Sequence, residues 1–164
     1  MSFLLDKKFS EKYEQYFAEI GGLNWYQSRY DDHGVDIYSD DKQTIIDVKC
    51  YATPQFVKHF TGAFIETYLP LSGRDGWLYD ENKLTTHYIL LQDCSRENVS
   101  YWKGWYIARD ALKAAMEAAE DEGDLLEKSI RSGSGYILPY EYLDQYCIEC
   151  WYGDKHSKEQ LESA

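Results

Sequence analysis

Two acidic residues and one lysine, Asp36, Asp47 and Lys49, lie close enough along this 164-residue chain to act together. The stretches that carry them are short apolar runs with β-branched residues, and the polar segment 39–44 between them is typical of a hairpin turn. If the turn is symmetric about the centre of that segment, Asp36 lies opposite Asp47 with Cβ atoms about 5 Å apart. Lys49 follows Asp47 by two residues and therefore points to the same face of the hairpin.

This grouping predicts a site for a divalent cation. Two carboxylates at that separation repel each other unless one is protonated or a cation lies between them. Mg²⁺ prefers oxygen ligands, so Asp36 and Asp47 suit it, and an ammonium group beside them could neutralise the charge of a reacting group.

The pattern resembles that of the PD-(D/E)XK nuclease superfamily, which includes restriction endonucleases and Holliday-junction resolvases. The matching residues are Asp36 at the start of one strand and Asp47-Val48-Lys49 on the next, while Val35 stands where the motif has its proline. The resemblance implies that Asp36, Asp47 and the Val48 carbonyl bind Mg²⁺, for which Mn²⁺ can substitute. It implies that Lys49 orients or activates the attacking water, or neutralises the developing charge.

The resemblance also implies a further carboxylate on the first helix. If the stripe from Phe9 to Ile20 faces the core, Glu14 and Glu19 lie at its borders, whereas Glu11 points nearly opposite. Glu14 is mid-helix and is the expected additional catalytic and metal-binding residue. The alternative is that Glu14 only keeps the helix solvated.

Three polar residues follow the motif strand, Gln55, Lys58 and His59. Related nucleases often place polar residues of the next helix near the scissile phosphate, so these three are the expected substrate-binding residues. A solvated helix face is the alternative.

The hydrophobic pattern predicts a chain of the α/β class. The order of elements resembles the restriction-endonuclease-like αβββαβ core, a mixed central sheet flanked by helices, from about residue 7 to residue 92. The expected core elements are a helix over Lys7–Ile20, a strand over Leu23–Tyr30, the two hairpin strands, a helix from Thr53 to about Tyr68, and a strand over Thr86–Gln92. The expected peripheral elements are a strand over Gly104–Ile107, a helix over Arg109–Glu122, a flexible turn over Ser132–Gly135, a strand over Tyr136–Pro139 and a helical turn over Glu141–Tyr146.

The length predicts one domain, residues 1–152, followed by a polar C-terminal tail, 153–164. No apolar run approaches the length that crosses a membrane and the N-terminus has no signal-peptide architecture, so a cytoplasmic protein is expected. The net charge of −12 argues against a protein that coats DNA non-specifically, but much of it is concentrated in residues 117–127 and in the tail.

The predicted function is therefore that of a Mg²⁺-dependent deoxyribonuclease with DNA as its partner, and a homodimer is left open. The alternative is an inactive nuclease-fold protein whose acidity lets it mimic DNA or bind and inhibit another protein. A separate pair, Cys147 and Cys150 with His156 beyond them, could bind zinc, although such cysteines more often pack as small hydrophobic residues.

Overall fold

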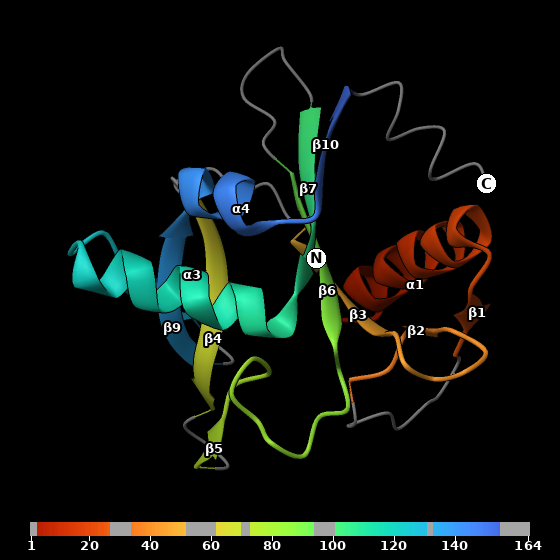
Figure 1. The fold of residues 1–164 in the computed structure, drawn as a ribbon, viewed down its shortest axis with the longest axis horizontal. Helices are drawn as coiled ribbons and strands as arrows, with labels where there is room; N and C mark the ends of the chain where they lie inside the picture. The colour runs from red at the N-terminus through yellow and green to blue at the C-terminus, as the bar shows by residue number, and fades with distance from the viewer. Residues whose placement is uncertain are drawn as a thin grey trace.

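The computed structural model describes residues 3–26, 34–51, 62–69, 73–93, 101–130 and 133–154, and it has a mixed α/β fold (Figure 1). The described helices are α1 (Phe3–Gly21), α3 (Arg109–Asp121) and α4 (Tyr140–Tyr146). The described strands are β1 (Asn24–Trp25), β2 (Ile37–Tyr38), β3 (Ile45–Tyr51), β4 (Gly62–Leu69), β5 (Arg74–Asp75), β6 (His87–Asp93), β7 (Tyr101–Ala108), β8 (Leu126–Ile130), β9 (Gly133–Pro139) and β10 (Glu149–Asp154).

These strands form two sheets. The first sheet has the order β1-β2-β3-β6-β7-β10, and the second has the order β5-β4-β9-β8. Strands β3 and β6 run parallel, and every other neighbouring pair among the described strands is antiparallel. The predicted mixed sheet is therefore present as the first sheet.

Strand β6 lies at the centre of the first sheet and is buried on both faces. Tyr88 and Leu90 belong to a large core that also includes residues of β4, β7, α3 and α4. Ile89 and Leu91 belong to a small core with residues of α1, β2 and β3. The expected strand over Thr86–Gln92 is confirmed as β6, and Figure 1 shows α1 on one side of β3 and β6 with α3 and α4 on the other.

Helix α1 packs on the first sheet through Tyr13, Phe17 and Ala18, which fill the small core. Phe17 follows Tyr13 by four residues and Ala18 by five, so the three lie toward the same side of the helix. Ile20 was expected on the same face but is 60% exposed, because the helix ends one residue later. Gly22 follows with φ +62°, a left-handed conformation that suits glycine and ends the helix where the sequence predicts.

The surface helix expected over Arg109–Glu122 is confirmed as α3. Leu112, Ala115, Met116 and Ala119 recur at helical spacing and are buried in the large core. Gly123, with φ +73°, follows the helix, which ends close to the expected Glu122.

The helix expected from Thr53 to about Tyr68 is wrong for its second half, because Gly62–Leu69 is strand β4. The segment is rich in β-branched and aromatic residues, which favour an extended chain. Its antiparallel partner is β9, and a Cβ atom on Gly62 would lie 2.0 Å from the Leu138 carbonyl oxygen. Pairing with a distant strand therefore decides the conformation, and residues 53–61 lie outside the described residues.

The flexible turn expected over Ser132–Gly135 is also wrong, because Gly133–Pro139 is strand β9. A Cβ atom on Gly135 would lie 2.0 Å from the Ile65 carbonyl oxygen of β4. The glycine is needed for the close approach of two backbones rather than for a bend.

The remaining boundaries differ by a few residues. Within the expected strand Leu23–Tyr30, β1 covers Asn24–Trp25, and residues 27–33 lie outside the described part of the chain. Strand β10 ends at Asp154, two residues into the expected tail, and residues 155–164 are not described. Among the helices that the structure describes, none combines the length and the apolar character needed to cross a membrane.

Candidate metal and phosphodiesterase site

The hairpin of β2 and β3 has the register that the turn predicts. Ile37 pairs with Ile46 and Tyr38 with Ile45, so continuing the register by one residue brings Asp36 level with Asp47. The turn is closed by a hydrogen bond of 2.9 Å from the Ser39 amide to the Thr44 carbonyl.

Backbone hydrogen bonds fix Asp36 at the open end of this hairpin, away from the turn. Its amide donates to the Ile46 carbonyl over 2.9 Å, and its Oδ2 accepts a 2.7 Å hydrogen bond from the Val48 amide. The carboxyl groups of Asp36 and Asp47 also share a hydrogen bond. Two carboxyl groups can share such a bond only if one of them carries a proton.

The site therefore favours a proton or a cation at Asp36. Burial, the negative charges of Asp47 and Glu14, and the hydrogen bond that the protonated Asp36 carboxyl group donates to Asp47 raise the pKa of Asp36 to about 9, and the Val48 amide only partly opposes them. A divalent ion could replace the shared proton and relieve the same repulsion.

Asp47 and Lys49 lie on the face of β3 that meets the large core. They pair across the sheet with Tyr88 and Leu90, which belong to that core, whereas Val48 between them belongs to the small core. The Lys49 ammonium lies 3.1 Å from Oδ2 of Asp47, and the Lys49 side chain is 27% exposed. The predicted sharing of one face is thus confirmed.

The surroundings of Lys49 keep it charged. Burial alone would lower the pKa of Lys49, but the charges of Asp47, Asp36 and Glu66 and the hydrogen bond to Asp47 outweigh this, so its pKa lies above the ordinary value. The ammonium also lies 5.3 Å from the centre of the Trp77 ring, within the range of a cation–π contact.

Glu14 is buried rather than solvated. It is 9% exposed, and the Trp25 indole Nε1 donates to its Oε2 over 3.2 Å. The negative charge of Glu14 contributes to the raised pKa of Asp36. Glu19 is exposed and Glu11 is half-buried, so Glu14 is the acidic residue of α1 that the structure brings to the site among those with described side chains.

The oxygen atoms of this site suit a hard cation, although few residues supply them. Among the described residues, no group of three or more His, Cys, Asp and Glu side chains is arranged to hold a metal ion. The Ile46 carbonyl accepts a hydrogen bond from the Asp36 amide and therefore points from β3 toward β2. In a strand, carbonyls two residues apart point the same way, so the Val48 carbonyl points toward β2 as well. Asp36, Asp47 and the Val48 carbonyl would therefore offer oxygen ligands, as magnesium requires.

Residues that sequence reasoning missed complete the site. Trp77 follows β5, and the Tyr88 hydroxyl donates to its carbonyl over 3.2 Å. The loop after Trp77 is held by Arg109, whose Nε donates to the Leu78 carbonyl at 3.1 Å and whose Nη2 donates to the Asp80 carbonyl at 2.7 Å. The feature of the sequence that pointed to Trp77 is a tryptophan within an otherwise polar loop.

Glu66 is the other missed residue. It lies on β4 of the second sheet, and its charge is one of those that raise the pKa of Lys49. A single acidic residue within an otherwise apolar and aromatic strand was the signal for it.

The expected substrate-binding residues Gln55, Lys58 and His59 lie outside the described residues. Of the cysteine pair, Cys147 packs at the border of the large core and Cys150 is exposed, while His156 is not described. The expectation that both cysteines pack as hydrophobic residues is wrong for Cys150.

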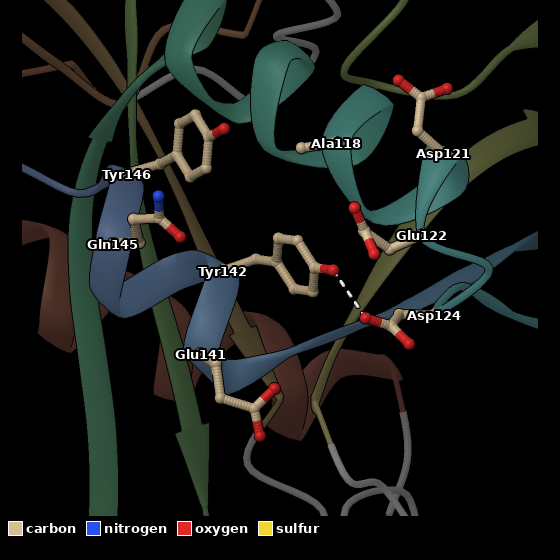
Figure 2. A pocket seen from close by; sticks show the side chains of 8 residues that line it. All are labelled: Ala118, Asp121, Glu122, Asp124, Glu141, Tyr142, Gln145 and Tyr146. Atoms are coloured by element: carbon tan, nitrogen blue, oxygen red, sulfur yellow. Dashed lines mark hydrogen bonds between the residues drawn. The ribbon is translucent and has the colours of Figure 1, made fainter.

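A separate hollow of about 490 Å³ lies between α3 and α4 (Figure 2). Four carboxylates line it, and the Tyr142 hydroxyl donates to Asp124 over 2.6 Å, which raises the pKa of Tyr142 to about 12. Its lining residues are Ala118, Asp121, Glu122, Asp124, Glu141, Tyr142, Gln145 and Tyr146. The hollow repels phosphate groups, so it suits basic groups better than nucleic acid.

Comparisons of this chain with protein-family models, with curated proteins and with solved structures found no match.

Proposed function

We propose that this chain is a Mg²⁺-dependent phosphodiesterase that hydrolyses DNA. The observation that carries the proposal is the hydrogen-bonded carboxyl pair Asp36 and Asp47, with Lys49 ion-paired to Asp47 on the same face of β3. Buried groups with strongly perturbed pKa values and a charged partner are typical of functional sites.

The fold supports the proposal through the order of its elements. Helix α1 is followed by the antiparallel strands β1, β2 and β3, and β6 then pairs parallel to β3. These elements follow the order of the expected nuclease core except for its second helix, of which the second half is strand β4 of the other sheet.

Each residue has a task in this proposal. Asp36 and Asp47 would hold Mg²⁺ together with the Val48 carbonyl, and Glu14 would add negative charge beside them. The ion would lower the pKa of a bound water and offset charge on the scissile phosphate. Lys49, kept protonated by its acidic neighbours, would stabilise negative charge that develops on the phosphate.

The test is incubation of the protein with supercoiled, linear, single-stranded and branched DNA in Mg²⁺, in Mn²⁺ and in EDTA. We expect cleavage of at least one DNA form with either metal and none in EDTA. Glu117→Gln is the matched control, because it removes an exposed carboxylate of α3 far along the chain from the hairpin. Loss of cleavage in EDTA together with retained cleavage in the control would support the site.

A second candidate function is an acidic binding module that does not cleave DNA. The net charge of −12 and the acidic hollow between α3 and α4 favour it, since both suit a basic partner. Isothermal titration with Mg²⁺ and Mn²⁺ separates the two proposals. Absence of both metal binding and cleavage would favour the binding module.

A further inference from the structure

The Lys49 ammonium lies between a carboxylate and an aromatic ring. It is 3.1 Å from Oδ2 of Asp47 and 5.3 Å from the centre of the Trp77 ring. Asp47 is the proposed metal ligand, so its oxygens would be shared with the cation, whereas a ring offers no oxygen to a metal. The negative face of a tryptophan ring attracts an ammonium group and can therefore hold Lys49 whether or not the metal is bound.

Tyr88 fixes the ring of Trp77. Trp77 is 7% exposed, and the centres of the Trp77 and Tyr88 rings lie 4.7 Å apart. The Tyr88 hydroxyl donates to the Trp77 carbonyl over 3.2 Å, and Tyr88 is itself fully buried. Tyr88 also pairs with Asp47 between β6 and β3. One buried tyrosine thus sets the position of the ring relative to the strand that carries both Asp47 and Lys49.

Arg109 holds the loop that follows Trp77. Its guanidinium donates to carbonyls of this loop, from Nε to Leu78 at 3.1 Å, from Nη1 to Lys83 at 2.9 Å and from Nη2 to Asp80 at 2.7 Å. A planar fork of donors fixes geometry more tightly than a single ammonium group does. The fork therefore restrains the loop that carries Trp77.

The end of the same loop contacts the hairpin. The Thr85 hydroxyl donates to the Gly34 carbonyl over 2.8 Å, two residues before Asp36. The Thr86 amide donates over 2.8 Å to the carbonyl of Ile45, the first residue of β3. Gly34 has φ +73°, and a Cβ atom there would lie 2.2 Å from Oγ1 of Thr85. The loop that begins at Trp77 is thus anchored to the segments that carry both proposed metal ligands.

We propose that Trp77 is a positioning residue for Lys49: the face of its ring holds the ammonium beside Asp47 through a cation–π contact. This inference rests on the proposed phosphodiesterase function and deepens it. Trp77 acts through Lys49 and needs no contact with the metal or the DNA. Because Tyr88 and Arg109 fix the ring, Lys49 meets a reacting phosphate from a set direction.

The first test compares Trp77→Leu with Trp77→Phe. We expect Trp77→Leu to lower kcat by about 10- to 30-fold with KM changed by less than about threefold, because a displaced Lys49 weakens the transition state more than substrate binding. Trp77→Phe keeps a ring face and should recover part of the rate. Equal kcat values for the two variants would overturn the inference.

Tyr79→Leu is the matched control. Tyr79 lies in the same loop, and its ring centre lies 6.0 Å from the ammonium of another lysine, Lys113 of α3. Removing that ring should leave kcat within about threefold of the parent, because Lys113 takes no part in the proposed site. A loss as large as that of Trp77→Leu would mean that the integrity of the loop sets the rate, and it would overturn the inference.

The second test needs neither DNA nor metal. Fluorinated tryptophans, introduced at position 77 alone by stop-codon suppression, keep the shape of the ring but withdraw electrons from its face. Urea unfolding in EDTA is followed along this series in the parent and in Lys49→Met. The unfolding equilibrium constant should rise by about fivefold along the series in the parent and much less in Lys49→Met. An equal response in both backgrounds would overturn the inference.

The two tests separate the two proposals. If the parent cleaves no DNA form while the fluorinated series responds only in the presence of Lys49, the phosphodiesterase proposal fails and the Trp77–Lys49 contact stands. If the parent cleaves while the series responds equally in both backgrounds, the function stands and the role of Trp77 fails.

Discussion

The Val48 amide donates a 2.7 Å hydrogen bond to Oδ2 of Asp36, so the middle residue of Asp47-Val48-Lys49 orients the carboxyl group of the other strand. The side chain of Val48 is meanwhile buried in the small core. One residue thus anchors the hairpin to α1 and fixes the position of a proposed metal ligand.

Asp47→Asn should abolish divalent metal binding and DNA cleavage while the protein stays folded. The amide keeps the volume of the side chain but removes the charge that attracts the cation. Calorimetric titration with Mn²⁺ measures metal binding, and circular dichroism shows whether the variant is folded. Cleavage by Asp47→Asn at the parent rate would place the metal site elsewhere.

Lys49→Ala should retain metal binding but lose most of the turnover, by about 10²- to 10⁴-fold in single-turnover rate. An ammonium group cannot be a metal ligand, so its contribution is to the transition state. Lys128→Ala, at an exposed position of β8, is the control and should cleave normally. Loss of metal binding in Lys49→Ala would mean instead that Lys49 maintains the structure of the site.

Asp36→Asn should stabilise the metal-free protein at neutral pH. The pKa of Asp36 is about 9 in the folded protein, against about 3.9 in an unfolded chain. The folded state therefore binds the proton more tightly, and wild-type stability falls as pH rises from about 4 to about 9. The amide mimics the protonated acid, so the gain should be absent near pH 4 and should grow by up to about 1.4 kcal/mol per pH unit.

Urea unfolding in EDTA at several pH values measures this gain. Asp41→Asn is a control of opposite sign in the same hairpin, because the Ser39 hydroxyl and the Gln43 amide hold the pKa of Asp41 below its usual range. That carboxylate stabilises the protein above its unfolded pKa, and the effect is lost as pH falls. An Asp36→Asn gain that does not vary with pH would contradict the shared proton.

Arg109→Ala should lower the free energy of unfolding by about 2 to 3 kcal/mol, because the guanidinium donates to several carbonyls of the loop after Trp77. Arg109→Lys should recover little, since one ammonium cannot reproduce the fork of donors. The exposed pair of Lys113 and Glu81 supplies a control: Lys113→Ala should change stability by less than about 0.5 kcal/mol. Equal stability of Arg109→Lys and the parent would show that the loop does not depend on the fork.

The hairpin and its carboxyl pair could be predicted because their geometry is local. Asp36 and Val48 are 12 residues apart, and the turn between them sets the register that brings the acidic residues together. Helix α3 was predictable for the same reason, since the spacing of its buried residues is a property of the helix alone.

The second sheet could not be predicted in this way. The contact between Thr67 and Ser134 spans 67 residues, and although the residues of β4 favour an extended chain, only the pairing with the distant β9 shows which sheet they join. Glu66 stands out in the sequence only as the one acidic residue of an apolar and aromatic strand, and no local pattern relates it to Lys49, which lies on a different sheet.

The parallel pairing of β3 with β6 has a consequence for how the protein folds. The contact between Ile45 and Thr86 spans 41 residues, and closing that loop costs about 1 kcal/mol more entropy than closing the 12 residues of the hairpin. The hairpin can form within microseconds, so the two acidic side chains meet before β6 arrives to bury them. We therefore expect the early folding rate to rise with salt or with added divalent ions, which screen this repulsion, and the cation that the site would use could also act as a folding aid.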